Sequence, residues 1–196
     1  MEKFIIGLGT GRCGTTSLSK LLSLQPDIYV PHEYGKPLPW QFAKEEIDIR
    51  ISELEKMNGD VAFYYLNYVE YLIERFPGVK FICLRRDREE TVDSYMKKSQ
   101  NRNNWIEHDG TVWEKAVHFY DSYPKFKTDS KREALGMYYD LYYSVAEKFE
   151  TKMANRFRIF DIKELNSATG VRNILNFAGF LDDEMKMDVG ISVNAT

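Results

Sequence analysis

Glycines and hydroxyl residues near the start of the chain have a spacing that could bind phosphate. Glycines stand at positions 7, 9, 11 and 14, and Thr15, Thr16 and Ser17 follow directly. The residues before them, Phe4 to Leu8, form a short apolar run that predicts a buried parallel strand. Leucines at helical spacing predict a helix that begins at Thr15. Because such a turn collects unpaired N–H groups and the positive end of the helix dipole, the stretch predicts a phosphate-binding loop.

The spacing of the glycines restricts the kind of phosphate ligand that the loop is expected to bind. Gly9 and Gly14 lie as far apart as the two glycines of a P-loop, and Thr16 stands where a P-loop has its hydroxyl residue. The lysine that contacts the β- and γ-phosphates in a P-loop is replaced by Thr15, so we expect a 5′-phosphate ligand without a γ-phosphoryl group to transfer. An ordinary glycine-rich turn of an α/β protein is the alternative interpretation.

Two arginines follow a later apolar run. Residues 79–84 predict a buried strand, and Arg85 and Arg86 come directly after it. Because open α/β sheets bind ligands at the carboxyl ends of their strands, we expect these arginines near the phosphate loop. A guanidinium can bind two phosphate oxygens at once, and the hydroxyl of Ser94 on the following helix can donate a further bond. The alternative is a charged helix start that forms only surface ion pairs.

An acidic residue and a histidine follow the second predicted strand, Ile28 to Val30. The segment 31–40 contains three prolines and a glycine and is therefore predicted to be a loop. His32 and Glu33 are the first groups near the phosphate loop that could exchange a proton. The alternative for both is a solvated surface loop.

The stretch from Gly9 to Leu18, Gly-Thr-Gly-Arg-Cys-Gly-Thr-Thr-Ser-Leu, resembles the 5′-phosphosulfate loop of sulfotransferases that use 3′-phosphoadenosine 5′-phosphosulfate (PAPS). Arg86, Asp87 and Ser94 match that family's 3′-phosphate motif, with Arg88 in place of the usual proline. The resemblance implies that PAPS is bound by Gly11, Arg12, Cys13, Gly14, Thr15, Thr16, Ser17, Arg86 and Ser94.

The resemblance also implies a reaction. In the sulfotransferases most similar to this sequence, a glutamate shortly after the second strand is the general base, and Glu33 matches that position. His32 is the alternative, since other branches use a histidine. Arg12 and the loop amides would stabilise charge on the leaving phosphate oxygen. The expected activity is transfer of a sulfuryl group from PAPS to a hydroxyl or amine of a small-molecule or glycan acceptor, without a metal ion.

Two other functions fit part of the pattern. One is a small-molecule kinase or another nucleotide-dependent enzyme, against which the absence of a lysine at Thr15 counts. The other is a catalytically silent nucleotide-binding protein of the same fold. The sequence also departs from cytosolic sulfotransferases, because it has no Arg-Lys-Gly stretch to hold the 3′-phosphate; Arg132 or Lys131 could replace it.

Composition limits the class of protein. The chain has 196 residues and a formal net charge of −3, which argues against a general nucleic-acid binder. Its two cysteines, Cys13 and Cys83, have no metal-ligand or disulfide spacing, which favours a cytoplasmic location. No segment is long and apolar enough to predict a membrane span.

The predicted fold is a single α/β domain over residues 1–196. Strands are expected at 4–8, 28–30, 60–66, 79–84 and 157–160, and helices at 41–57, 67–76, 131–154 and 171–180. These give three layers: a central, mostly parallel five-stranded sheet with helices on both faces, similar to P-loop proteins. An insertion at about 99–130, with a helix at 111–123, is expected to be a helical lid or acceptor-binding segment.

Overall fold

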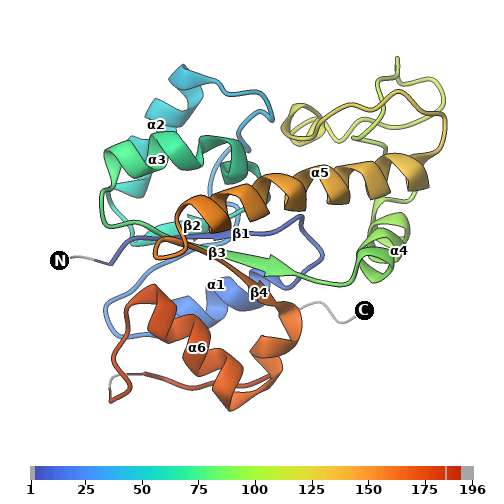
Figure 1. Ribbon diagram of the computed structural model, residues 1–196. Coiled ribbons are helices and arrows are strands. Elements are labelled where there is room, and N and C mark those ends of the chain that lie inside the picture. Colours follow the sequence, from blue (N-terminus) through green and yellow to red (C-terminus); the bar gives the residue numbers. More distant parts are fainter. Residues whose placement is uncertain (1–2, 184, 191–196) are drawn as a thin grey trace.

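A computed structural model describes residues 3–183 and 185–190. Its centre is a four-stranded sheet in the order β2-β1-β3-β4, and all three pairs of neighbouring strands are parallel (Figure 1). The strands are β1 (Ile5–Leu8), β2 (Gly59–Val61), β3 (Lys80–Arg85) and β4 (Phe157–Asp161). The prediction of a parallel sheet is confirmed. Because all strands point the same way, the loops after β1, β2, β3 and β4 gather at one edge of the sheet.

The prediction of five strands is wrong, because Ile28–Val30 does not join the sheet. Side chains of the first helix take the backbone groups that a strand would pair: Ser19 donates to the Val30 carbonyl at 2.8 Å, and Ser23 accepts from the Val30 N–H at 3.1 Å. Side-chain hydroxyls that bond to nearby backbone compete with a strand ladder in this way. Only His32, beyond this segment, forms an isolated parallel bridge to the end of β2.

The strand predicted at 60–66 is also shorter than expected. β2 ends at Val61, and Phe63–Tyr68 forms a 3₁₀ helix, η1. Phe63, Tyr64 and Tyr65 are consecutive and all buried. In a strand, successive side chains would point to opposite faces, whereas the 3₁₀ turns place all three in the core.

Helices cover both faces of the sheet, which confirms the layered α/β arrangement (Figure 1). On one face, α1 (Thr15–Ser23) and α6 (Ala168–Ala178) pack around Ile5, Ile82 and Leu84. On the other, α2 (Lys44–Leu54), α3 (Val69–Arg75) and α5 (Lys131–Lys152) form an aromatic core with η1. The helix α4 (Arg88–Ser99) follows β3 directly, and the 3₁₀ helix η3 (Ile162–Asn166) follows β4.

The segment between α4 and α5 contains little helix. The helix expected at 111–123 does not form, and only the 3₁₀ turn η2 (Tyr120–Ser122) is regular. The Lys125 ammonium lies inside the segment and donates to the carbonyls of Asn104, Tyr120 and Tyr123. Tyr123, directly after η2, connects the segment to the core by stacking on Phe63, with ring centroids 4.5 Å apart.

Across residues 3–183 and 185–190, none of the helices combines the length and apolar composition needed to cross a bilayer. Within the same residues, no group of three or more His, Cys, Asp and Glu side chains is placed to hold a metal ion.

Candidate functional site

The glycine-rich loop joins β1 to α1 at the carboxyl edge of the sheet. Gly14 precedes the first helical residue and has φ 90°, a left-handed conformation that suits glycine. Gly9 has φ 142°, and a Cβ there would lie 2.4 Å from Cys13 Sγ and 2.8 Å from the Leu84 carbonyl oxygen. Arg12 is left-handed as well, with φ 57°, although it is not a glycine. Such a conformation in a larger residue is strained and points to a functional constraint.

Tyrosine hydroxyls from the core form hydrogen bonds with the backbone of the first residues of this loop. The Gly9 N–H donates to the Tyr142 hydroxyl at 3.0 Å, and the Tyr138 hydroxyl donates to the Thr10 carbonyl at 3.0 Å. Tyr95 donates to the same carbonyl. All three tyrosines are buried, and burial raises the pKa of each, so the rings stay neutral. The start of the loop is therefore fixed to α4 and α5.

The structure brings Arg12, Arg86 and Ser94 together. Arg12 Nε donates to Ser94 Oγ at 3.0 Å, and Arg86 Nη1 donates to the Arg12 carbonyl oxygen at 3.3 Å. The Tyr139 hydroxyl donates to the Arg86 carbonyl at 2.7 Å. Arg86 also forms an ion pair with Glu90, at 2.9 Å, and its side chain is 31% exposed. An incoming anion can therefore reach the Arg86 guanidinium by competing with one exposed carboxylate.

His32 lies against the start of α1. Its Nε2 atom is 3.0 Å from Thr15 Oγ1 and 3.5 Å from Thr16 Oγ1. Burial lowers the pKa of His32, which favours the neutral imidazole. The proline-rich loop after residue 30 therefore touches the phosphate loop at the position where a P-loop has its lysine.

Glu33 follows His32 in a left-handed conformation, with φ 52°. Its N–H donates to the carbonyl oxygen of Val61, the last residue of β2, at 3.0 Å. Burial, and then the negative charge of Asp60, raise the pKa of Glu33 to about 7. A carboxyl group that titrates near neutral pH can take a proton from a substrate at that pH.

Asp60 and Arg50 were not expected from the sequence, yet they support the Glu33 loop. Asp60 lies in the middle of β2 and is fully buried, and Arg50 on α2 is 3% exposed. Arg50 Nη1 is 3.8 Å from Asp60 Oδ2. Burial raises the pKa of Asp60 to about 6, opposed by hydrogen bonds to its carboxylate. The sequence feature that could have pointed to Asp60 is its position directly before an apolar run.

The other residues predicted to bind the PAPS donor lie within or beside the loop. Cys13 is buried, and burial raises its pKa, so it remains a thiol. Ser17 is 7% exposed in the first turn of α1. Gly11 lies against Tyr95, whose hydroxyl oxygen would be 2.3 Å from a Cβ at that position.

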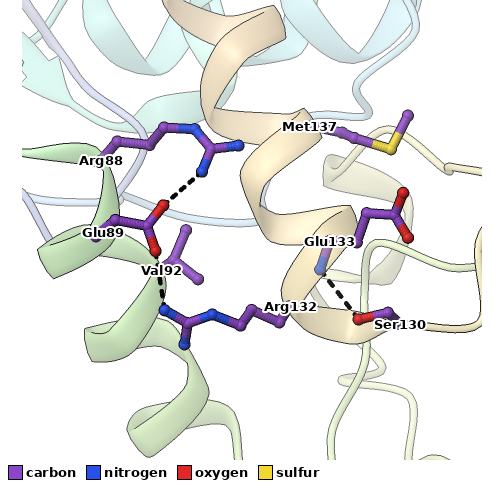
Figure 2. A pocket seen from close by; sticks show the side chains of 7 residues that line it. All are labelled: Arg88, Glu89, Val92, Ser130, Arg132, Glu133 and Met137. Atoms are coloured by element: carbon purple, nitrogen blue, oxygen red, sulfur yellow. Dashed lines mark hydrogen bonds and ion pairs between the residues drawn. The ribbon is translucent and has the colours of Figure 1, made fainter.

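The two residues considered for the 3′-phosphate, Arg132 and Lys131, have other partners here. Arg132 forms an ion pair with Asp93 at 2.6 Å. It forms another with Glu89 at 2.9 Å, beside a cavity of about 310 Å³ between α4 and α5 (Figure 2). The Lys131 ammonium donates to the Gln100 carbonyl at 2.7 Å. Within the described part of the chain, this leaves Arg86 as the arginine bonded to the phosphate loop.

Comparison with known proteins finds similarity to solved structures. No family model matches the chain, and no curated protein matches its sequence. Among solved structures, it is similar to the crystal structure of a sulfotransferase from Alicyclobacillus acidocaldarius, with 16% identity and a TM-score of 0.54. The match covers 94% of this chain and 85% of the other. At this identity the similarity establishes a sulfotransferase-like fold.

The raised pKa of Glu33 predicts how stability depends on pH. A carboxyl group whose pKa is higher in the folded state is harder to ionise there, so it lowers stability as the pH rises from its unfolded value, near 4.5, through 7. We expect Glu33→Gln to leave the free energy of unfolding nearly unchanged at pH 4.5. At pH 8 it should raise that free energy relative to wild type by roughly 1–3 kcal/mol.

Urea unfolding at both pH values measures this difference, and Glu55→Gln, at the exposed end of α2, is the matched control. An equal effect of Glu33→Gln at the two pH values would show that Glu33 ionises freely in the folded protein.

Proposed function

We propose that this protein is a sulfotransferase that uses PAPS as its donor. The observation that supports the proposal most is the contact of Arg86 and Ser94 with the phosphate loop through Arg12, at 3.3 Å and 3.0 Å. The two segments that we propose bind anions therefore lie side by side at the carboxyl edge of the sheet. A ligand with two phosphate groups on one adenosine fits such a pair, and the sulfotransferase-like fold supports the same donor.

In this proposal the loop binds the 5′-phosphosulfate. The amides from Arg12 to Thr16 precede or open α1, where a helix N-terminus favours negative charge. The Arg12 guanidinium and these amides would stabilise the charge that develops on the 5′-phosphate oxygen as it leaves. Arg86 and Ser94 would bind the 3′-phosphate, with Arg86 exchanging Glu90 for a phosphate oxygen.

Glu33 is the proposed general base. The acceptor oxygen or nitrogen forms a bond to the sulfur while the bond from sulfur to the 5′-phosphate oxygen breaks. The acceptor proton goes to the Glu33 carboxylate, and adenosine 3′,5′-bisphosphate leaves. His32 is less suited to this role because its Nε2 atom is occupied by the hydroxyls of Thr15 and Thr16.

A kinase remains the second candidate, but the site favours it less. A phosphoryl-transfer site needs a cation at the β- and γ-phosphates, and the lysine position holds Thr15, whose hydroxyl contacts a histidine with a lowered pKa.

Removing the Arg86 guanidinium tests the donor. We expect Arg86→Ala to weaken binding of adenosine 3′,5′-bisphosphate by about 10–100-fold, the loss typical of a charge-assisted hydrogen bond. Binding of adenosine 5′-monophosphate, which lacks the 3′-phosphate, should change by less than about 3-fold. Isothermal titration calorimetry measures both, with ATP as the competing nucleotide.

Arg88→Ala is the matched control, because Arg88 follows the same strand but pairs with Asp140 on α5, at 2.9 Å. Equal losses for the two nucleotides in Arg86→Ala would remove Arg86 from the 3′-phosphate site. Tighter binding of ATP than of the bisphosphate by the wild-type protein would favour the kinase.

Replacing the base tests the reaction. We expect Glu33→Gln to bind adenosine 3′,5′-bisphosphate as wild type does, while turnover falls by about 10²–10⁴-fold. Turnover is followed as release of the bisphosphate from PAPS in the presence of phenols, sugars and amines. His32→Gln is the companion variant: if it abolishes turnover and Glu33→Gln does not, the histidine is the base.

A further inference from the structure

The carboxylate of Asp60 binds the backbone of the loop that carries Glu33. It accepts from the Tyr34 N–H at 3.1 Å, from the Tyr65 hydroxyl at 2.9 Å and from the Val61 N–H at 2.8 Å. Asp60 is fully buried in the central sheet, where a carboxylate is costly unless it is hydrogen-bonded. Two of its three donors belong to the residues that fix Glu33: Tyr34 follows it, and the Val61 carbonyl accepts its N–H.

Arg50 holds the other side of the same turn. Its Nη2 atom donates to the Lys36 carbonyl at 2.6 Å, and its Nη1 atom donates to the Tyr65 hydroxyl at 3.0 Å. Between the two anchored residues, Gly35 has φ 68°, and a Cβ there would be 2.8 Å from Arg50 Nη2. The turn from Glu33 to Lys36 therefore packs closely against the Arg50 guanidinium.

This support explains the conformation of Glu33. A glutamate in the left-handed region is strained by roughly 1–3 kcal/mol and persists where the surrounding bonds fix it. The bonds from Asp60 and Arg50 begin one residue after Glu33 and end three residues after it.

The charges around the Glu33 side chain come from several elements. The titratable groups that face it or adjoin it are His32 on its own loop, Asp60 on β2, Tyr64 on η1, Tyr95 on α4 and Tyr123 after η2. Burial raises the pKa of all three tyrosines and lowers that of His32, so these groups are neutral near pH 7. Asp60 is the group in this set that carries negative charge there.

We propose that Asp60, together with Arg50, is a positioning residue for Glu33: it holds the turn that presents the carboxyl group, and its negative charge opposes the ionisation of that group. The description of Glu33 as a base rests on the proposed function, whereas the coupling between the two carboxyl groups does not. Asp60 has no contact with the phosphate loop among its hydrogen bonds in the described residues, so the coupling should act on proton transfer and leave donor binding unchanged.

The sign of the effect follows from the charge. Asp60→Asn keeps the shape of the side chain but removes the negative charge that lies behind Glu33. It also leaves the positive charge of Arg50 less neutralised by nearby negative charge. Both changes favour the ionised form of Glu33, so its titration should move to lower pH.

The test is a ¹³C NMR titration of glutamate carboxyl groups in the protein without ligands, with the Glu33 signal assigned by its loss in Glu33→Gln. We expect the Glu33 midpoint to fall by at least roughly half a pH unit in Asp60→Asn. Asp48→Asn is the matched control, because it removes from α2 a half-buried carboxylate that pairs with Lys44 and Arg75. An unchanged midpoint in folded Asp60→Asn overturns the proposal.

Tyr65→Phe decides the matter if Asp60→Asn does not fold. It keeps Asp60 in place but removes one hydrogen bond to its carboxylate, so Asp60 ionises less readily. The Glu33 midpoint should then fall in the same direction by a smaller amount, and no shift would contradict the proposal.

Because the titration needs no donor or acceptor, its result stands even if the protein fails to bind adenosine 3′,5′-bisphosphate. Once turnover is measured, the acid limb of kcat/KM should move to lower pH in Asp60→Asn while the Kd for the bisphosphate stays constant. A purely structural role would lower activity at every pH without moving the limb.

Discussion

The hydrogen bonds that join Arg86, Arg12 and Ser94 connect the two halves of the candidate site, and the parallel pairing of β1 with β3 is the constraint that makes them possible. They link the turn after β1 with the start of α4 after β3, two segments that the parallel pairing of β1 and β3 places at the same sheet edge. A single strand reversed in direction would carry one of the two segments proposed to bind phosphate to the opposite end of the sheet. The tyrosines of α4 and α5 add rigidity, because their hydroxyls bind the loop backbone from the core side.

Polar groups buried in the core form hydrogen bonds with the loops at the same edge of the sheet. Buried tyrosine hydroxyls hold the phosphate loop, and the buried Asp60 and Arg50 hold the turn after Glu33. Each of these groups is costly to bury and is retained with hydrogen-bond partners. Two of the candidate residues, Arg12 and Glu33, also have left-handed backbones. Strained backbone and buried polar groups therefore occur together at both the phosphate loop and the Glu33 turn.

Much of this arrangement could be predicted from local patterns. The glycine spacing and the apolar run before it predicted β1, the loop and α1, and the arginine after β3 was expected at the same edge. The short strand at 28–30 could not be excluded, because its loss depends on Ser19 and Ser23 of α1. The Asp60–Arg50 pair joins β2 to α2, and such a contact leaves no periodic signal in the sequence.

A crystal structure of the protein with adenosine 3′,5′-bisphosphate would show whether the two segments bind the two phosphate groups. We expect the 5′-phosphate at the backbone N–H groups that open α1 and the 3′-phosphate within hydrogen-bond distance of Arg86 and Ser94, with the Arg86–Glu90 pair broken or rearranged. A bisphosphate bound away from this edge, or one whose 3′-phosphate points into solvent while Arg86 keeps Glu90, would contradict it.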